Sequence, residues 1–417
     1  MGIRIESSRK NKKLFLIIAL VINIGLLGFF KYYNFFIDSF NELLSSFGIR
    51  QSLHSLYIIL PVGISFYTFH GMSYIIDIYK DKIKSTRSLI DYSLFVSYFP
   101  LLVAGPIERA HHLLPQLKEK RRFDYSQAVS GMKQILWGLF KKMAIADFCA
   151  GPANLIFDNY GEASGSTLFL GAFFFTIQIY CDFSGYSDIA IGVSKLFGIN
   201  LLKNFNYPYF SRDIAEFWRR WHISLSSWFK DYLYIPLGGS RGGTWMRIRN
   251  TFIIFVVSGF WHGANWTFVV WGALNAFYMM PSMIRRSNRK SLNTVAENRM
   301  FPSGKEFFQM ALTFLLTVFA WIVFRSETLP NAFEYIVHIF DRSFFSWPEY
   351  TFHKLIFVEI LFLFIVEWFA RKNNFGLEKL GNHWPKAARW LFYLLLIGII
   401  VSNMREEGSL EFIYFQF

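Results

Sequence analysis

The 417-residue sequence has few charged residues and very few cysteines. Charged side chains make up 17% of it, against about 25% in soluble globular proteins, whereas hydrophobic residues make up 53%. Its 2 cysteines, Cys149 and Cys181, lie far apart in sequence, which excludes a disulfide framework, a CxxC motif and a zinc-binding spacing. The scarcity of charge and the long apolar runs together indicate a polytopic membrane protein.

Several catalytic motifs are missing as well. The sequence contains no HExxH, no GxxxxGK[ST] and no GxSxG. These absences argue against an intramembrane metalloprotease, a nucleotide-driven pump and a serine nucleophile elbow, and we expect no metal site. The chemistry that remains is general-base catalysis, in which a histidine activates the hydroxyl of another molecule.

Acidic residues are the minority among the charges, with 29 Asp and Glu against 43 Lys and Arg, for a net charge of +14. The basic residues cluster between apolar runs, at Arg9–Lys13, Lys118–Arg122 and Arg285–Lys290. Loops that face anionic lipid on the cytoplasmic side have this composition. We therefore expect membrane lipid as a partner, no nucleic acid, and an N-terminus in the cytoplasm.

The apolar runs predict an all-α, polytopic integral membrane protein with about nine or ten membrane segments. The runs are Leu14–Phe30, Ser55–Ile76, Leu89–Val103, Ala128–Cys149, Thr167–Tyr180, Ile189–Ile199, Thr251–Met280, Phe307–Phe324, Leu355–Ala370 and Trp390–Ser402. Basic loops precede and follow Leu89–Val103, so we interpret that run as re-entrant. No internal repeat or soluble domain interrupts the pattern, which predicts one membrane domain over residues 1–417.

The segment Thr251–Pro281 contains no Asp, Glu, Lys or Arg, yet it carries His262 and Asn265, flanked by Trp261 and Trp266. A titratable imidazole inside a membrane segment is costly and is by default a candidate functional group. Histidine takes and returns a proton near neutral pH, which suits a general base. The alternative is a structural histidine that hydrogen-bonds a backbone carbonyl within a helix bundle.

The stretch Ser211–Gly239 is amphipathic when it is placed on a helix. One face is aromatic and apolar and includes His222, while the other is basic and polar. This pattern predicts a single helix at the membrane surface that Pro236 and the glycines after it end. His222 is then a second candidate, or simply part of an interfacial aromatic belt.

The string CDFSGYSD places Asp182, Ser184, Tyr186 and Asp188 between two apolar runs. Carboxylates in such a position predict a cavity, a partner or a re-entrant bend, and Gly185 would permit the turn. These side chains are candidates to orient a histidine or bind substrate hydroxyls. The alternative is a short polar loop that joins two helices.

Long motifs in a fixed order make the sequence resemble the membrane-bound O-acyltransferases, in particular the bacterial alginate and peptidoglycan O-acetylase branch. The matching strings are LPVGISFYTFHGMSYIIDIY (Leu60–Tyr79), FPLLVAGPIER (Phe99–Arg109), CDFSGYSDIAIG (Cys181–Gly192), FWRRWHISLSSWFKDYLYIPLGG (Phe217–Gly239), SGFWHGANWTFVVWG (Ser258–Gly272) and FIYFQF (Phe412–Phe417).

The resemblance implies a ring of about 9–11 helices around a thinned central tunnel, with additional interfacial or re-entrant helices, in the bacterial cytoplasmic membrane. It implies that His262 is the essential histidine and His222 the second characteristic one. The donor would be acetyl-CoA or another acyl thioester, with no bound cofactor. The acceptor would be a cell-envelope polysaccharide, reached directly or through a partner acetyltransferase of the SGNH-hydrolase type. Tyr414 in the C-terminal motif would be a transient acyl carrier, unless its ring only packs at the interface.

Family members usually have further hydrophobic segments ahead of the position of Leu14, so we expect either a smaller ring or a sequence with a late start. In the working hypothesis His262 is the base, and Asn265, at i+3 on the same helix, hydrogen-bonds its ring or an oxyanion. Within this enzyme class, D-alanyl transfer to teichoic acid and another acylation, such as lipid acylation, are the alternatives. Outside it, the alternatives are a transporter or flippase and a non-catalytic scaffold.

Overall fold

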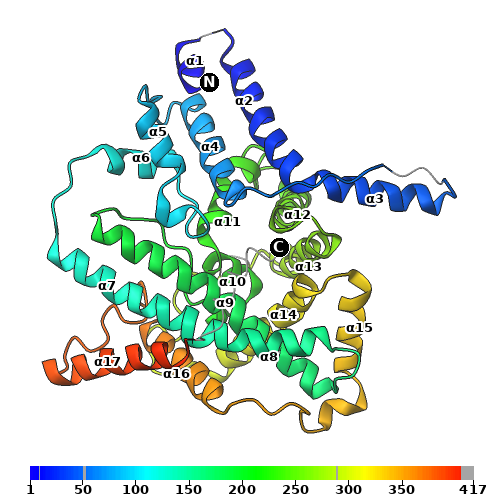
Figure 1. Ribbon diagram of the computed structural model, residues 1–417, viewed down its shortest axis with the longest axis vertical. Coiled ribbons are helices and arrows are strands. Elements are labelled where there is room, and N and C mark those ends of the chain that lie inside the picture. The colour runs from blue at the N-terminus through cyan, green and yellow to red at the C-terminus, as the bar shows by residue number, and fades with distance from the viewer. Residues whose placement is uncertain (9, 50–52, 288–289, 405–417) are drawn as a thin grey trace. The chain divides into compact units, whose positions relative to one another are not determined.

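The computed structural model describes residues 1–8, 10–49, 53–287 and 290–404, and all regular structure in that part of the chain is helical (Figure 1). This confirms the predicted all-α class. Four described helices are long and apolar enough to cross a membrane: Lys12–Ser46, Gly165–Leu196, Trp266–Ile284 and Gly304–Arg325. Thr167–Tyr180 and most of Ile189–Ile199 lie in one of these helices, Gly165–Leu196, and the remaining apolar runs form shorter or less apolar helices. The larger number of segments, the ring and the tunnel stay predictions.

Packing divides the described chain into two compact units. Unit 1 holds residues 1–122 together with the short segment Gly263–Asn265, and unit 2 holds residues 123–262 and everything described from Trp266 onward. The expectation of one membrane domain over residues 1–417 stays a prediction.

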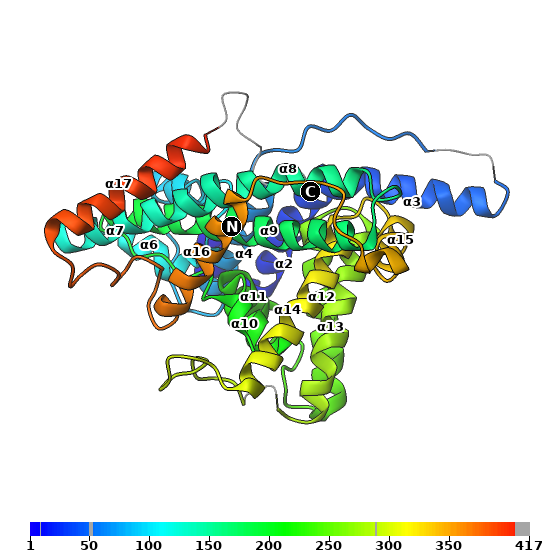
Figure 2. The same ribbon diagram turned by 90° about the horizontal axis from the view of Figure 1, so that it is seen from below.

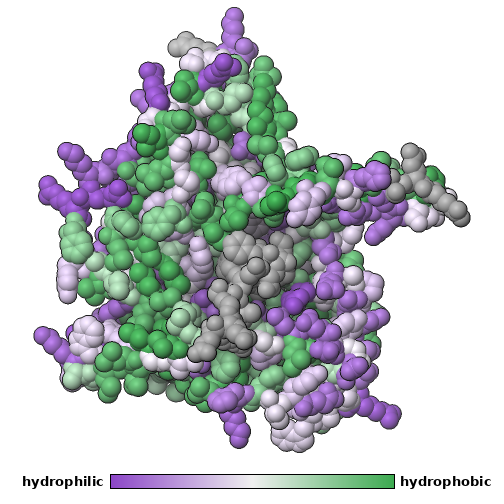
Figure 3. All heavy atoms as spheres, in the orientation of Figure 1, coloured by the Kyte–Doolittle hydropathy of each residue, from purple (hydrophilic) through white to green (hydrophobic). Residues whose placement is uncertain are grey.

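Unit 1 is built from six α-helices and two short irregular turns of helix. Its elements are α1 (Gly2–Ser7), α2 (Lys12–Leu27), η1 (Gly28–Tyr32), α3 (Tyr33–Ser46), α4 (Ile64–Tyr79), α5 (Leu89–Val96), η2 (Phe99–Leu101) and α6 (Ala110–Lys118). Hydrophobic side chains cover the outside of α2, as Figure 3 shows, and Leu14, Val21 and Ile24 are all more than half exposed. An apolar exterior of this kind fits contact with lipid.

Two histidine–carboxylate pairs lie close together in unit 1. His111 Nδ1 is 2.7 Å from Asp77 Oδ2, and His112 Nδ1 is 2.7 Å from Glu108 Oε2. Both carboxylates are fully buried, whereas both histidines are partly exposed. The hydrogen bond that His112 donates to the Glu108 carboxylate raises the pKa of His112. These pairs give each of the two buried carboxylates a hydrogen-bond partner, and Glu108 belongs to the FPLLVAGPIER motif.

Unit 2 contains the remaining helices, which include three of the four membrane-spanning candidates. They are α7 (Tyr125–Leu139), η3 (Phe140–Ala146), α8 (Asp147–Asp158), α9 (Gly165–Leu196), η4 (Pro208–Phe210), α10 (Ile214–Arg220), α11 (Ile223–Phe229), η5 (Lys230–Tyr234), α12 (Gly243–His262), α13 (Trp266–Ile284), α14 (Gly304–Arg325), α15 (Leu329–Ile339), η6 (Arg342–Phe345), α16 (Leu355–Ala370) and α17 (Lys386–Ser402).

Helix α9 contains the whole CDFSGYSD string, so the predicted loop or bend at Gly185 is wrong. The glycine serves close packing instead, because α7 and α9 lie side by side (Figures 1 and 2). A Cβ at Gly185 would lie 2.8 Å from the carbonyl oxygen of Gly138, and one at Gly138 would lie 2.6 Å from that of Gly185. Gly131 and Gly192 repeat this arrangement two turns away.

Replacing Gly138 by valine is expected to lower the free energy of unfolding by about 1–3 kcal/mol, because its side chain would overlap the backbone of α9. The measurement is the apparent melting temperature of the purified protein in detergent. Gly398→Val is the matched control, since Gly398 lies inside α17 with no atom near its Cβ position. Equal melting temperatures for the two variants would contradict the close packing of α7 on α9.

The segment Thr251–Pro281 is not one continuous helix. α12 ends at His262 and α13 begins at Trp266, and the two helices pack along each other (Figure 2). Small residues permit this approach, because Gly259 on α12 and Gly272 on α13 each face the backbone of the other helix. The prediction that Asn265 lies one helical turn beyond His262 is therefore wrong, since the helix stops first.

The predicted single amphipathic helix over Ser211–Gly239 is also wrong. The stretch forms α10, α11 and η5, with a break at Trp221 and His222. His222 adopts a left-handed backbone conformation, with φ of +42°. The hydrophobic pattern was periodic across this break, so periodicity gave no sign of it.

Candidate functional site

His262 is the last residue of α12 and is enclosed by aromatic rings. It is 7% exposed, and its ring centroid lies 4.9 Å from that of Trp261, 5.3 Å from that of Trp271 on α13 and 5.5 Å from that of Phe324 on α14. Three helices of unit 2 therefore hold one imidazole in an apolar environment.

His222 lies at the break between α10 and α11 and is fully buried. Its Nδ1 is 3.0 Å from Oδ1 of Asn204, while Nδ2 of Asn204 donates to Ser187 Oγ at 3.1 Å. The amide nitrogen of Asn204 already donates to the serine, so its amide oxygen faces His222. This oxygen accepts a hydrogen bond from Nδ1–H of His222, which places the ring proton on Nδ1. The Nε2 atom is then a proton acceptor, and it has no hydrogen-bond partner in the described part of the chain.

The two histidines lie near each other and interact electrostatically. Trp261 contacts both, with its ring centroid 6.3 Å from that of His222 and 4.9 Å from that of His262. Burial lowers the pKa of His222 well below its usual value, and the charge of His262 lowers it further. His222 is therefore neutral at pH 7, and the structure brings together the two histidines that the sequence singled out.

The candidates on α9 are paired with lysines. Asp182 Oδ1 lies 2.7 Å from Lys142 Nζ, and Asp188 Oδ2 lies 2.7 Å from Lys141 Nζ. Lys141 also donates to Ser184 Oγ at 2.9 Å. Lys141 and Lys142 therefore neutralise two carboxylates inside an otherwise apolar helix. A partner for these carboxylates was one of the expectations from the sequence.

The remaining site residues predicted from the sequence are not part of these ion pairs. Tyr186 is half-buried on α9, Trp266 is about half exposed at the start of α13, and Asn265 belongs to the segment between α12 and α13. Tyr414 lies outside the described residues. No group of three or more His, Cys, Asp or Glu side chains in the described chain is arranged to hold a metal ion.

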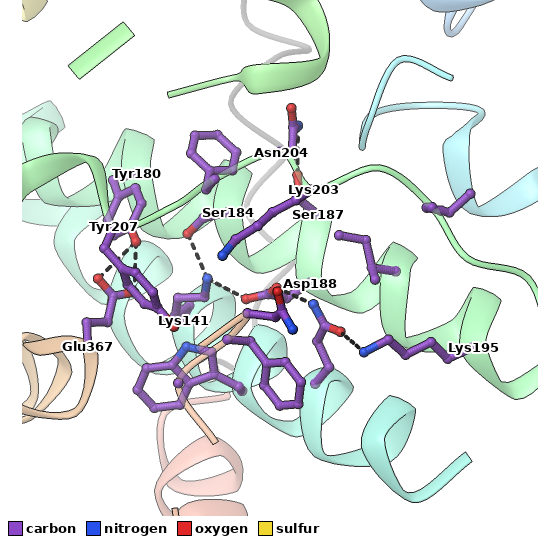
Figure 4. A pocket seen from close by; sticks show the side chains of 18 residues that line it. Lys141, Tyr180, Ser184, Ser187, Asp188, Lys195, Lys203, Asn204, Tyr207 and Glu367 are labelled. Atoms are coloured by element: carbon purple, nitrogen blue, oxygen red, sulfur yellow. Dashed lines mark hydrogen bonds and ion pairs between the residues drawn. The ribbon is translucent and has the colours of Figure 1, made fainter. Parts of the chain in front are cut away.

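A polar cavity of about 150 Å³ lies beside the His222 network, and Figure 4 shows the side chains that line it. Ser184, Ser187, Asp188 and Asn204 belong to the lining. Since Asn204 also hydrogen-bonds His222, one residue connects the cavity to the histidine pair.

Sequence reasoning missed several residues of this cavity, namely Lys141, Lys195, Lys203, Asn204, Tyr207 and Glu367. Lys141 and Lys142 interrupt the apolar run Ala128–Cys149, and this feature could have been used as a sign of a buried charge pair. Asn204 gives no such sign, because it reaches His222 only through the folded loop between α9 and η4.

Comparison with known proteins identifies related sequences. The family model described as MBOAT, membrane-bound O-acyltransferase family, matches residues 55–324. The probable alginate O-acetylase AlgI of Pseudomonas aeruginosa is 41% identical over 93% of this chain and 72% of its own length. The peptidoglycan O-acetyltransferase of Helicobacter pylori is 37% identical over 80% of this chain and 66% of its own length. The teichoic acid D-alanyltransferase of Bacillus subtilis is 28% identical over 64% of this chain and 69% of its own length.

Proposed function

Because the chain belongs to the membrane-bound O-acyltransferase family and is a multi-pass membrane protein with O-acyltransferase activity, we propose that it O-acetylates a cell-envelope polysaccharide. The donor is acetyl-CoA or another cytoplasmic acyl thioester. The acetyl group crosses the bacterial cytoplasmic membrane, in which the N-terminus faces the cytoplasm. The proposal rests on the relatives that act on alginate and peptidoglycan.

His262 is the general base in this proposal, and its burial among three aromatic rings is the observation that supports it best. A nitrogen of His262 removes the proton of the acceptor hydroxyl as its oxygen attacks the thioester carbonyl carbon. The carbon–sulfur bond then breaks, and the thiolate takes the proton back from the imidazolium. The products are an ester and a free thiol.

His222 assists by staying neutral beside the base. A positive charge on His222 would oppose the protonation of His262 and so weaken it as a proton acceptor. Burial keeps His222 neutral, and Asn204 fixes the proton on Nδ1. The unpartnered Nε2 of His222 is then available to position the donor or to assist proton movement.

D-alanyl transfer to teichoic acid is the second candidate, since the Bacillus subtilis D-alanyltransferase is a relative. Its 28% identity is lower than the 41% of the alginate O-acetylase, which favours acetyl transfer. Membranes supplied with labelled acetyl-CoA or with labelled D-alanyl thioester separate the two functions. Label from acetyl-CoA in the envelope polymer supports the first, and label from D-alanine alone supports the second.

The acceptor hydroxyl belongs to a tyrosine carrier, a partner acetyltransferase of the SGNH-hydrolase type or the polymer itself. Tyr414→Phe removes one hydroxyl and keeps the ring. If Tyr414 carries the acyl group, we expect polymer acetylation in whole cells to fall to background, because the second transfer has no ester to use. Polymer acetate is the measurement, and Tyr393→Phe on α17 is the control. If Tyr414→Phe cells acetylate the polymer as the wild type does, Tyr414 does not carry the acyl group and its ring only packs.

A further inference from the structure

The polar cavity beside His222 carries more positive than negative charge. Its lining includes the ammonium groups of Lys141, Lys195 and Lys203 and the carboxylates of Asp188 and Glu367. One positive charge therefore remains even when both carboxylates are ionised. Figure 4 shows Lys203 extended toward Ser184 and Lys141 across the cavity. The space is several times larger than a single water molecule needs.

Two of the three lysines have only neutral hydrogen-bond acceptors. Lys203 Nζ donates to Asn206 Oδ1 at 2.9 Å and to the carbonyl oxygen of Asn373 at 3.2 Å. Lys195 Nζ donates to Ser130 Oγ at 3.1 Å and to Gln134 Oε1 at 2.8 Å. Neither forms an ion pair with any residue that the structure describes. Asp188 and Glu378 act on both ammonium groups from beyond ion-pair distance, so an anion bound in the cavity would add the direct counter-charge that these lysines lack.

Tyr207 provides an independent sign of a ligand. It lines the cavity, it is 5% exposed, and its hydroxyl has no hydrogen-bond partner among the described residues. Its backbone is left-handed, with φ of +52°, and the Lys203 ammonium lies 5.4 Å from the centre of its ring. A buried hydroxyl is nearly always hydrogen-bonded in a folded protein, so this one indicates an acceptor that enters the cavity.

We infer that the cavity binds a phosphate group of the thioester donor, with Lys203 and the hydroxyl of Tyr207 as its direct contacts. Phosphate oxygens accept several charge-assisted hydrogen bonds at once, and lysine is a common partner for them. Asn204 lines the same cavity and hydrogen-bonds His222, so a phosphate bound here lies next to the network that holds the histidine pair. The inference rests on the proposed function in that the donor is a phosphorylated coenzyme.

The charge on Lys203 gives this site a pH dependence. Burial lowers the pKa of Lys203 to about 8. The groups that act on it are Asp188 and Glu378, which raise this pKa, and Arg220 and Lys141, which lower it further; Lys195 and Glu367 also line the cavity. Lys203 is protonated below about pH 8 and loses its charge above that pH. Affinity for a phosphate is therefore expected to fall as the pH rises through about 8.

The test is calorimetric titration of the full-length protein in detergent with coenzyme A and with pantetheine, which has the thiol arm without phosphate. We expect coenzyme A to bind at least about tenfold more tightly, and inorganic phosphate to compete with it. Lys203→Gln should weaken coenzyme A binding about tenfold and leave pantetheine binding unchanged. Lys203→Arg, which keeps the charge, should retain most of the affinity, and Tyr207→Phe should reduce it severalfold.

Lys133→Gln is the matched control, because Lys133 lies on α7 beside Gln134 but its ammonium donates to Asn382 and does not line the cavity. Equal affinity for coenzyme A and pantetheine, or equal loss of both in Lys203→Gln, would overturn the inference. Transfer assays then separate this inference from the proposed function. An unchanged KM for acetyl-CoA in Lys203→Gln contradicts the phosphate site alone, whereas phosphate-dependent binding without any acetyl transfer contradicts the proposed function alone.

Discussion

Replacing His262 by alanine is expected to reduce acyl transfer about 10²–10⁴-fold, the usual contribution of a general base. The side chain is nearly buried at the end of α12, and its ring packs against Trp261, Trp271 and Phe324. Glutamine cannot take and return a proton near neutral pH, so His262→Gln, which keeps a polar side chain of similar size, should be equally inactive. The measurement is the rate of acetyl transfer from labelled acetyl-CoA in membranes that contain equal amounts of each variant.

His383→Ala is the control for this substitution, because His383 is exposed in the loop before α17 and should have wild-type activity when replaced. Both variants must insert and elute as the wild type does. A His262→Ala protein that passes this check and still transfers acetyl at the wild-type rate would show that another group removes the proton.

Asn204→Asp is expected to move the pH dependence of transfer to higher pH. A carboxylate in place of the amide would lie about 3 Å from Nδ1 of His222 and would favour the protonated ring. The folded-state pKa of His222 would then rise toward neutrality. Below that pKa, the charge on His222 would weaken His262 as a base, so activity should fall on the acidic side by an order of magnitude or more and recover as the pH rises.

The measurement for this variant is a complete pH profile of acetyl transfer, since a purely structural defect lowers the rate at every pH alike. Asn200→Asp is the matched control, because Asn200 lies in the same loop and its amide accepts from Gln127 instead of a histidine. An Asn204→Asp profile parallel to that of the wild type would contradict the role of Asn204 in fixing the tautomer of His222.

The helical class and the two histidines could be predicted from sequence, because apolar runs and an uncharged segment around His262 are local features. The breaks in the helices at His222 and after His262 could not be predicted from the sequence. Hydrophobic periodicity continued through His222, and nothing in its side chain signals a left-handed backbone. Likewise, the short segment Gly263–Asn265 separates two helices within a run that contains no Asp, Glu, Lys or Arg.

The string CDFSGYSD was misread for a different physical reason. A bend or loop at Gly185 was one of the expectations for its carboxylates, yet they stay inside α9, where Lys141 and Lys142 on η3 pair with them. A partner that comes from another element cannot be recognised from the string alone. The same holds for Asn204 and Lys203, whose roles depend on a loop that brings them to α9 and His222.

The most direct measurement uses the purified protein in sealed vesicles, with labelled acetyl-CoA on the side of its basic loops and a hydroxyl acceptor on the other side. We expect labelled ester on the acceptor, free coenzyme A in equal amount, and neither product with His262→Ala. Labelled acetate or acetyl-CoA that crosses the membrane without forming an ester would contradict it, and would make the chain a transporter.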